Sequence, residues 1–275
     1  MSERGDRTVL VTGANSGIGL ATVLELARRG WSTVGSARSD EKAEVVAKAA
    51  ADAGVEIATV LLDVNHADRC AAVIDEVRPF ALVNNAGYSI TGAVEDVGDD
   101  EVHDALETMV VAPMRLARLA VPHMRARRGG RIVNVSSIYG RATTPMTGWY
   151  QAAKHALEAV SDALRAEAAG AGVKVVLVEP GGFRTGIWES TEHEIERRAG
   201  SRYESAYQRT LLGTRLSQPF MGEPETVARV IARALSSRFP RPRYLVGYDA
   251  QAIALWDRLT PTEVKDRIVR MALGL

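Results

Sequence analysis

The chain has 275 residues, of which 46% are hydrophobic and 25% charged, the proportions of an ordinary globular protein. Its 34 basic and 34 acidic residues balance, so no net field attracts nucleic acid or an anionic membrane surface. Residues 1–7 are polar and no apolar stretch reaches the ~18 residues that a membrane span requires, so we expect a cytoplasmic protein without a signal peptide or a membrane span.

The first part of the chain alternates between strand-like and helix-like segments. The β-branched run at 8–12 ends in a glycine-rich turn, as a buried parallel strand that feeds a helix would. After this turn the patterns predict helices at 18–29, 41–53 and 67–77, and strands at 31–37, 56–62 and 80–83. Successive strand–helix units of this kind predict an α/β fold with a doubly wound parallel sheet.

The second part continues this alternation as far as Pro180. A long helical segment at 99–127 is followed by a strand at 131–135, a helix at 148–169 and a strand at 173–178. The chain finishes with a helix at 224–236, a strand at 243–246 and two short helices. Because no linker, repeat or low-complexity segment interrupts the pattern, we expect residues 1–275 to form a single domain.

Residues 186–220 break this rhythm, with dense acidic and basic residues and a few aromatic and leucine side chains between them. A structureless loop of this length is uncommon in a compact domain, and such insertions usually serve as lids or binding segments. We therefore expect a substrate lid here. A pair of surface helices without a ligand role is the alternative.

The sequence lacks the pattern of a metal site. Its histidines and its single cysteine, Cys70, show none of the spacings that metal ligands need. Cys70 lies in a helical segment and has no second cysteine with which to form an intrachain disulfide. We expect an inert thiol and no bound metal.

The turn after the first strand has the spacing Thr-Gly-x-x-x-Gly-x-Gly, with glycines at 13, 17 and 19. Glycine lets the backbone pass close to a pyrophosphate, and the following helix offers free N–H groups and the positive end of its dipole. A glycine-rich loop alone would be read as a tight structural turn. The strand–turn–helix context here predicts a dinucleotide site.

A candidate acid–base pair lies in the helix at 148–169. Tyr150 and Lys154 are four residues apart, so both side chains project from one face of the helix. A nearby ammonium favours tyrosinate over phenol, and we expect Lys154 to lower the pKa of Tyr150 toward working pH. Most such pairs are surface pairs. Here Ser137 follows a strand of the same sheet, at the edge where α/β folds bind ligands, which favours a catalytic role.

Together these segments resemble the short-chain dehydrogenase/reductase family over nearly the whole chain, and within it the 17β-hydroxysteroid and retinol dehydrogenases. The matching segments are Thr12-Gly13-Ala14-Asn15-Ser16-Gly17-Ile18-Gly19, Asp63-Val64, Asn84-Asn85-Ala86-Gly87, Ser137, Tyr150-Gln151-Ala152-Ala153-Lys154 and Pro180-Gly181-Gly182-Phe183-Arg184-Thr185. The resemblance implies a seven-stranded Rossmann-type sheet, a nicotinamide cofactor and a homo-oligomer, either a dimer or a tetramer.

The resemblance also implies roles for single residues. Tyr150 would donate or accept the proton, Ser137 would position the substrate oxygen, and Lys154 would bind the nicotinamide ribose and tune Tyr150. Thr185 would contact the carboxamide and Asp63 the adenine. The other residues expected at the cofactor are Gly13, Asn15, Ser16, Gly17, Ile18, Gly19, Arg38, Ser39, Val64, Asn84, Ala86, Gly87, Pro180, Gly181 and Phe183.

The end of the second strand predicts NADP(H) rather than NAD(H). NAD-dependent members place an acidic residue there for the ribose 2′-hydroxyl, whereas Gly35-Ser36-Ala37-Arg38-Ser39 contains none. Arg38 can pair with a 2′-phosphate through two charge-assisted hydrogen bonds. We therefore expect an NADP(H)-dependent carbonyl reductase or ketoreductase, which could also oxidise the corresponding secondary alcohol.

One position departs from the family pattern. Members carry an asparagine on the long fourth helix, and alignment through Ala112-Pro113-Met114 places Met109 there. A thioether cannot donate a hydrogen bond and accepts one only weakly, so Met109 weakens the expected proton relay from Lys154 to solvent. The alternative is a non-redox member, namely a cyclase, an isomerase or a cofactor-binding regulator. The intact Ser137, Tyr150 and Lys154 argue against it.

Apolar and aromatic residues occur in segments that should border the crevice. Those expected to contact substrate are Tyr88, Tyr139, Met146, Trp149, Ile187 and Trp188. They favour a bulky hydrophobic carbonyl or alcohol, steroid-like, retinoid-like or polyketide-like, over a sugar or a charged acid. Each of them could instead belong to the core.

Overall fold

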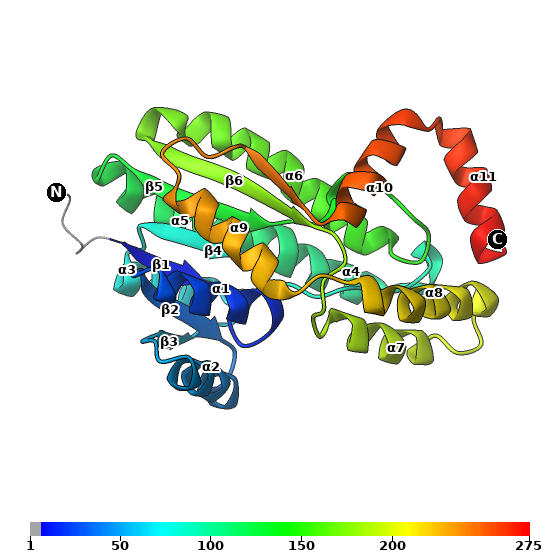
Figure 1. The fold of residues 1–275 in the computed structure, drawn as a ribbon, viewed down its shortest axis with the longest axis horizontal. Coiled ribbons are helices and arrows are strands. Elements are labelled where there is room, and N and C mark those ends of the chain that lie inside the picture. Colours follow the sequence, from blue (N-terminus) through cyan, green and yellow to red (C-terminus); the bar gives the residue numbers. More distant parts are fainter. Residues whose placement is uncertain (1–6) are drawn as a thin grey trace.

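The computed structural model describes residues 7–275, without the side chains of residues 187–190. Seven parallel strands form one sheet in the order β3-β2-β1-β4-β5-β6-β7, with helices on both faces (Figure 1). The strands are β1 (Thr8–Val11), β2 (Ser32–Ala37), β3 (Ala58–Leu61), β4 (Ala81–Asn84), β5 (Gly130–Val135), β6 (Val173–Pro180) and β7 (Arg243–Val246). The predicted α/β fold with a parallel, doubly wound sheet is confirmed.

Three helices cover each face of the sheet. On one face lie α1 (Gly17–Arg28), α2 (Asp40–Asp52) and α9 (Pro224–Ser236), and on the other α3 (Ala67–Val77), α5 (Ala112–Ala126) and α6 (Gly148–Ala168). The remaining helices are α4 (Asp99–Leu106), α7 (Ile187–Arg197), α8 (Glu204–Ser217), α10 (Tyr248–Leu259) and α11 (Thr262–Leu273). Of the helices described, none is long and apolar enough to cross a membrane.

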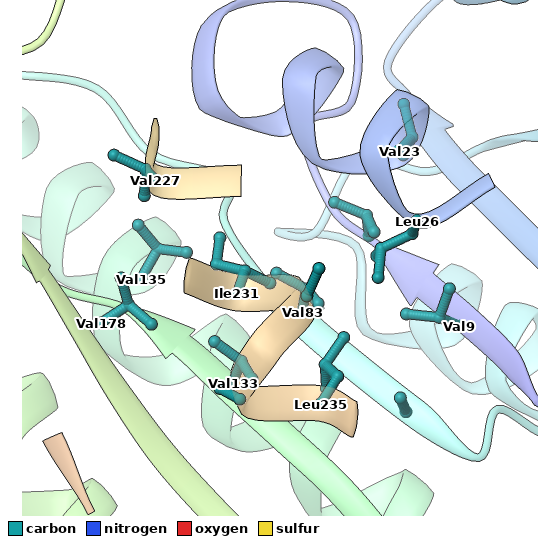
Figure 2. Packing of buried hydrophobic residues seen from close by; sticks show 14 of the residues in the cluster. Val9, Val23, Leu26, Val83, Val133, Val135, Val178, Val227, Ile231 and Leu235 are labelled. Carbon is teal, nitrogen blue, oxygen red and sulfur yellow. The ribbon is translucent and has the colours of Figure 1, made fainter. Parts of the chain in front are cut away.

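The strands are apolar on both faces because both faces are covered. Successive side chains of a strand point to opposite sides of the sheet. In β1, Val9 and Val11 pack on the face covered by α1 and α9, whereas Leu10 packs on the face covered by α3 and α5. Figure 2 shows the first of these faces, where the labelled side chains are Val9, Val23, Leu26, Val83, Val133, Val135, Val178, Val227, Ile231 and Leu235.

The direction in which the sheet is built reverses beside β1, which pairs with β2 on one side and with β4 on the other. The chain runs outward from β1 to β3 and then returns to β4. In open parallel sheets, the crevice outside the carboxyl ends of the strands at such a point binds ligands. The glycine-rich turn follows β1 and Asn85 follows β4, so both lie at this crevice.

The helical segment expected at 99–127 is not one regular helix. Helices α4 and α5 are joined by a π-helical turn over Glu107–Val111. A π-helical turn holds an additional residue, and such turns often occur at functional sites. Met109 lies in this turn and is 1% exposed.

The segment expected as a lid forms the helices α7 and α8, which are bound to the body by buried polar contacts. The Tyr207 hydroxyl donates to the Asp96 carboxylate at 2.7 Å and accepts from the Ala93 N–H at 2.7 Å. Arg198 Nε donates to the Thr91 carbonyl oxygen at 2.7 Å. Both helices are therefore attached to the stretch of chain between β4 and α4.

Candidate active site

A cavity of about 920 Å³ opens at the carboxyl ends of the strands. Its walls come from the turns after β1 to β6, from α6, and from parts of α7, α8 and α10. This volume lies near the upper end of the range for ligand pockets. The cavity is therefore large enough for a large ligand, or for two ligands side by side.

Three glycines shape the turn between β1 and α1. Gly13 and Gly17 have φ angles of +65° and +50°, a region that residues with a side chain rarely adopt. A Cβ atom on Gly19 would lie 2.1 Å from the carbonyl oxygen of Gly13, so a side chain there would push the turn open. The three positions keep the turn tight against the helix that follows.

The turn brings the N-terminus of α1 to the cavity, where Ser16, Gly17 and Ile18 form part of the wall. The Ser16 side chain makes no capping hydrogen bond, and the first bond inside the helix runs from Leu20 N–H to the Ser16 carbonyl oxygen. The N–H groups before Leu20 therefore have no partner within the helix. With the helix dipole they form an anion site that fits the pyrophosphate of a dinucleotide.

Asn85 and Thr12 brace this turn against the loop after β4. The Thr12 hydroxyl oxygen accepts from the N–H groups of Asn85 and Ala86, each at 3.0 Å. The Asn85 amide donates to the carbonyl oxygens of Thr12 at 3.0 Å and Gly13 at 3.2 Å. Asn85 belongs to the segment Asn84–Gly87 that the resemblance places along the cofactor, and it lines the cavity. Its contacts hold the turn after β1 against the loop after β4.

Most of the residues expected at the cofactor lie along this cavity. Asn84 does not, because its amide donates to Asn134 Oδ1 at 2.8 Å and to the Pro113 carbonyl oxygen at 3.2 Å, inside the protein. Gly19 and Ser39 are also not among the described residues that line the cavity. The expected residues along the cavity are Gly13, Asn15, Ser16, Gly17, Ile18, Arg38, Asp63, Val64, Ala86, Gly87, Tyr150, Lys154, Pro180, Gly181, Phe183 and Thr185.

Ser137, Tyr150 and Lys154 meet in the cavity wall between β5 and α6. The Ser137 hydroxyl accepts from the Tyr139 N–H at 3.1 Å and lies close enough to the Tyr150 hydroxyl to lower its pKa. Lys154 Nζ donates to the Val135 carbonyl oxygen at 3.0 Å and lies 5.7 Å from the centre of the Tyr150 ring. The end of β5 thus holds both the serine and the ammonium group next to the tyrosine.

Burial sets the protonation of the tyrosine and the lysine. It raises the pKa of Tyr150 to about 12, opposed by the neighbouring Ser137 hydroxyl. The expectation that the pKa of Tyr150 is lowered toward working pH was wrong, because the loss of hydration on burial outweighs the groups that favour the tyrosinate. Burial also lowers the pKa of Lys154 to about 8, opposed by the negative charge of Glu158. At neutral pH Tyr150 is therefore a protonated phenol, and Lys154 loses its proton a little above neutrality.

The wall after β2 carries two basic side chains. Arg38 follows β2 directly and is exposed, and Lys42 lies in the first turn of α2. Both line the cavity, as does Asp63 after β3. The Asp63 carboxylate accepts from the Asn65 N–H at 3.0 Å, which holds the loop after β3 in place.

Only some of the residues expected to contact substrate line the cavity. Tyr88 and Tyr139 line the cavity. Met146 packs instead among buried residues that include Tyr207, and Trp149 donates its indole N–H to the Val94 carbonyl oxygen at 3.3 Å. The side chains of Ile187 and Trp188 lie outside the described residues. Lining residues that no motif marked include Thr191, Thr210, Thr214, Ser217, Phe220 and Ile253.

Met109 lies behind the active site rather than in its wall. It packs in an apolar cluster with Ile90, Val102 and Ala153, against which the Tyr150 ring also packs. Its sulfur is 3.7 Å from the position that a Cβ atom on Gly87 would take. Met109 therefore fills space between the loop after β4 and α6.

Comparisons with known proteins agree with this geometry. Residues 7–196 match the family described as short chain dehydrogenase. Retinol dehydrogenase 16 of Rattus norvegicus is 32% identical over 289 residues, which cover 98% of this chain and 89% of that protein. A short-chain dehydrogenase from Streptomyces avermitilis is 31% identical, with a TM-score of 0.79 over 98% of this chain and 97% of the other. An actinorhodin polyketide ketoreductase solved with NADPH is 28% identical, with a TM-score of 0.73 over 86% of this chain and 93% of the other.

These matches extend over most of the chain and include both the sheet and the segments that form the cavity. The chain belongs to the short-chain dehydrogenase family of oxidoreductases.

Proposed function

We propose that this protein is an NADP(H)-dependent carbonyl reductase that acts on a bulky, largely apolar ketone or aldehyde. The observation that carries the proposal is that Ser137 and Tyr150 lie next to each other on the wall of the same cavity as the glycine-rich turn. Two adjacent hydroxyl groups can hold a carbonyl oxygen and protonate it. The likeness to a retinol dehydrogenase and to a polyketide ketoreductase supports alcohol–carbonyl chemistry on a large substrate.

The nicotinamide cofactor would supply the hydride. Ser16 and Gly17 would hold its pyrophosphate at the N-terminus of α1, where the absence of Cβ atoms on the glycines leaves room for it. Thr185 faces Gly17 across the cavity wall, since its Cγ2 lies 3.1 Å from the position of a Cβ atom on that glycine. We assign Thr185 to the carboxamide and Lys154 to the ribose hydroxyl groups.

The protonation of Tyr150 favours reduction over oxidation. Burial raises the pKa of its phenol to about 12, so at neutral pH it can donate a proton to an oxygen that gains negative charge. Ser137 can donate a hydrogen bond to the same oxygen and orient it. Lys154, held by the Val135 carbonyl oxygen, places a positive charge beside the ring and stabilises the tyrosinate that remains.

The preference for NADP(H) rests on Arg38 and is supported by Lys42. Both side chains border the cavity beside β2, where a 2′-phosphate would lie. A guanidinium matches the geometry of a phosphate, and a second cation nearby adds to the attraction. The likeness to a ketoreductase solved with NADPH agrees with this assignment.

We also propose that residues 7–275 act as one catalytic domain in which α7 and α8 form the substrate wall. Thr191 of α7 and Thr210 and Thr214 of α8 border the cavity, and the last two are four residues apart on one face of their helix. The Thr210 hydroxyl donates to the Ala206 carbonyl oxygen at 2.9 Å, which satisfies it within the helix. The Thr210 hydroxyl therefore needs no hydrogen bond from a substrate.

The decisive experiment is a measurement of NADPH consumption with a panel of ketones and aldehydes of increasing size. We expect turnover with bulky apolar carbonyls, and turnover lower by about 10²- to 10⁴-fold with Tyr150→Phe under the same conditions. Binding of NADPH without consumption by any carbonyl would contradict the proposal. That result would favour a member of the family that has left redox chemistry.

A further inference from the structure

Beyond the two side chains that line the cavity, α6 carries a row of ionisable residues. Tyr150, Lys154, Glu158 and Asp162 follow one another at intervals of four residues, so they lie along one side of the helix. Tyr150 and Lys154 line the cavity, whereas Glu158 is buried and contacts Arg243 of β7. The row leads from the proposed acid into the interior of the protein.

Glu158 meets a second buried carboxyl group, that of Glu179 in β6. Glu179 is 0% exposed, and its carboxyl group lies within hydrogen-bonding reach of Glu158. Arg243 Nε is 3.0 Å from Glu158 Oε2 and 3.1 Å from Glu179 Oε1. Arg141 Nε is 3.4 Å from Glu179 Oε2, and its own side chain is 45% exposed.

The hydrogen-bond donors around Glu158 and Glu179 are too few for all four carboxyl oxygens. Arg243 Nε carries one hydrogen, which it donates to Glu158 Oε2 and so cannot also donate to Glu179. Within the described part of the chain, Glu158 Oε1 and both oxygens of Glu179 have no hydrogen-bond donor. Buried acceptors without donors are unfavourable. A proton between Glu158 and Glu179 turns one carboxyl group into a donor for the other.

The charges lead to the same arrangement. Two neighbouring carboxylates that are away from water resist double ionisation, so the pKa of one of them is raised. Burial and the negative charge of Glu158 raise the pKa of Glu179 to about 7. Below this pH the pair carries one proton and one negative charge. The negative charge belongs on Glu158, because Glu158 accepts the hydrogen bond from Arg243.

We propose that Glu158 and Glu179 are positioning residues for Lys154: they share one proton, and the negative charge left on Glu158 keeps the Lys154 ammonium charged beside Tyr150. This inference rests on the proposed role of Lys154. Burial lowers the pKa of Lys154 to about 8 and the charge of Glu158 opposes that shift. Without this charge, more of Lys154 would be neutral amine near neutral pH.

Other charged groups surround the pair. On α6, Arg165 pairs with Asp162 at 2.7 Å, and Asp162 also accepts from Arg243 at 2.5 Å. Arg141 approaches from the segment after β5, and Asp249 of α10 lies against Gly181, just beyond the end of β6. Lys154 has Glu158 as the charged neighbour that raises its pKa. Removal of the Glu158 carboxylate should therefore lower the pKa of Lys154, whereas removal of the Asp162 carboxylate should not.

The shared proton can be tested in the cofactor-free protein by infrared spectroscopy. A protonated carboxyl group has a carbonyl-stretch band that a carboxylate lacks. We expect this band in the wild type below the pKa of about 7 and its loss above it. It should be absent from Glu179→Gln, whose amide can donate to Glu158 in place of the proton. Burial also raises the pKa of Glu194, so the Glu179→Gln spectrum serves as the reference from which the band is measured.

The effect on Lys154 can be tested by the affinity for NADPH as a function of pH, which needs no substrate. The affinity should fall as Lys154 loses its proton, above about pH 8 in the wild type. In Glu158→Gln we expect this fall to move to lower pH by about one unit, because an opposite charge has been removed from the lysine. Asp162→Asn is the matched control, because it removes another acidic partner of Arg243, one turn further along α6. In this variant the affinity for NADPH should fall at the same pH as in the wild type.

The absence of the difference band would overturn the proposal, as would equal shifts of the affinity profile in Glu158→Gln and Asp162→Asn. Equal shifts are the behaviour of a purely structural cluster. If Glu158→Gln does not fold, the double variant with Glu179→Gln makes the same measurement, because its two amides can bond to each other. Neither readout depends on turnover, so a protein that shows both effects but reduces no carbonyl would refute the proposed function and keep this inference.

Discussion

Among single residues, Tyr150 is the side chain on which turnover should depend most directly. Tyr150→Phe removes the proton donor and keeps the ring that packs beside Tyr139 and Met109. We expect kcat to fall by about 10²- to 10⁴-fold, the usual contribution of a general acid. The Kd for NADPH and the melting temperature should stay close to the wild-type values. Ketone reduction at a near-normal rate by this variant would exclude Tyr150 as the acid.

Arg38 is the residue that should decide between the two nicotinamide cofactors. A charge-assisted hydrogen bond contributes about 1.5–3 kcal/mol, so Arg38→Leu should raise the Kd for NADPH about 10- to 100-fold and change that for NADH little. Ala37→Asp together with Arg38→Leu should reverse the preference, since the acid can accept from a ribose 2′-hydroxyl. Arg241→Leu, which removes an exposed positive charge outside the cavity lining, controls for the change in net charge. Equal wild-type affinities for NADH and NADPH would contradict this assignment.

Among the elements of the fold, the π-helical turn over Glu107–Val111 is the one whose role is least evident from the sequence. Met109→Asn places an amide in an apolar cluster, and a buried polar group without partners costs about 1–3 kcal/mol. We expect the free energy of unfolding to fall by that amount, measured by urea denaturation. Met109→Leu, which keeps the volume and apolar character, should cost less than about 1.5 kcal/mol. If the asparagine variant is as stable as the leucine variant, the turn contains polar partners or water, as a proton relay requires.

The strands could be predicted from the sequence because each is an apolar run between turn signals, and each lies within a few residues of its expected position. The division of the segment at 99–127 into two helices could not be predicted, because its apolar pattern continues through the π-helical turn. Asn84 and Asn85 are alike in sequence. The pairing of Asn84 with Asn134 across β4 and β5 turns the first asparagine inward and leaves the second at the cavity. The cavity wall on α7 and α8 depends on how these helices dock, which no motif records.

In the whole molecule, the cavity joins segments that are far apart in the sequence, from the turn after β1 to α6, α8 and α10. A ligand that fills it binds only the folded protein, so NADPH at a 100-fold excess over its Kd should stabilise the fold by about 2.7 kcal/mol. For a domain of this size, that corresponds to a rise in melting temperature of roughly 5 to 10 °C.

The rise in melting temperature should separate the cofactors and the variants. NADH at the same concentration should raise the melting temperature less, because it lacks the 2′-phosphate that Arg38 would bind. Tyr150→Phe should keep the rise with NADPH. Gly19→Ala should lose it, because a Cβ atom 2.1 Å from the Gly13 carbonyl oxygen forces the turn away from its cofactor-binding shape. Equal rises with NADH and NADPH would remove the role given to Arg38, whereas no rise with either would contradict the dinucleotide site itself. A Gly19→Ala protein that is still stabilised by NADPH would show that the pyrophosphate is held elsewhere than at the N-terminus of α1.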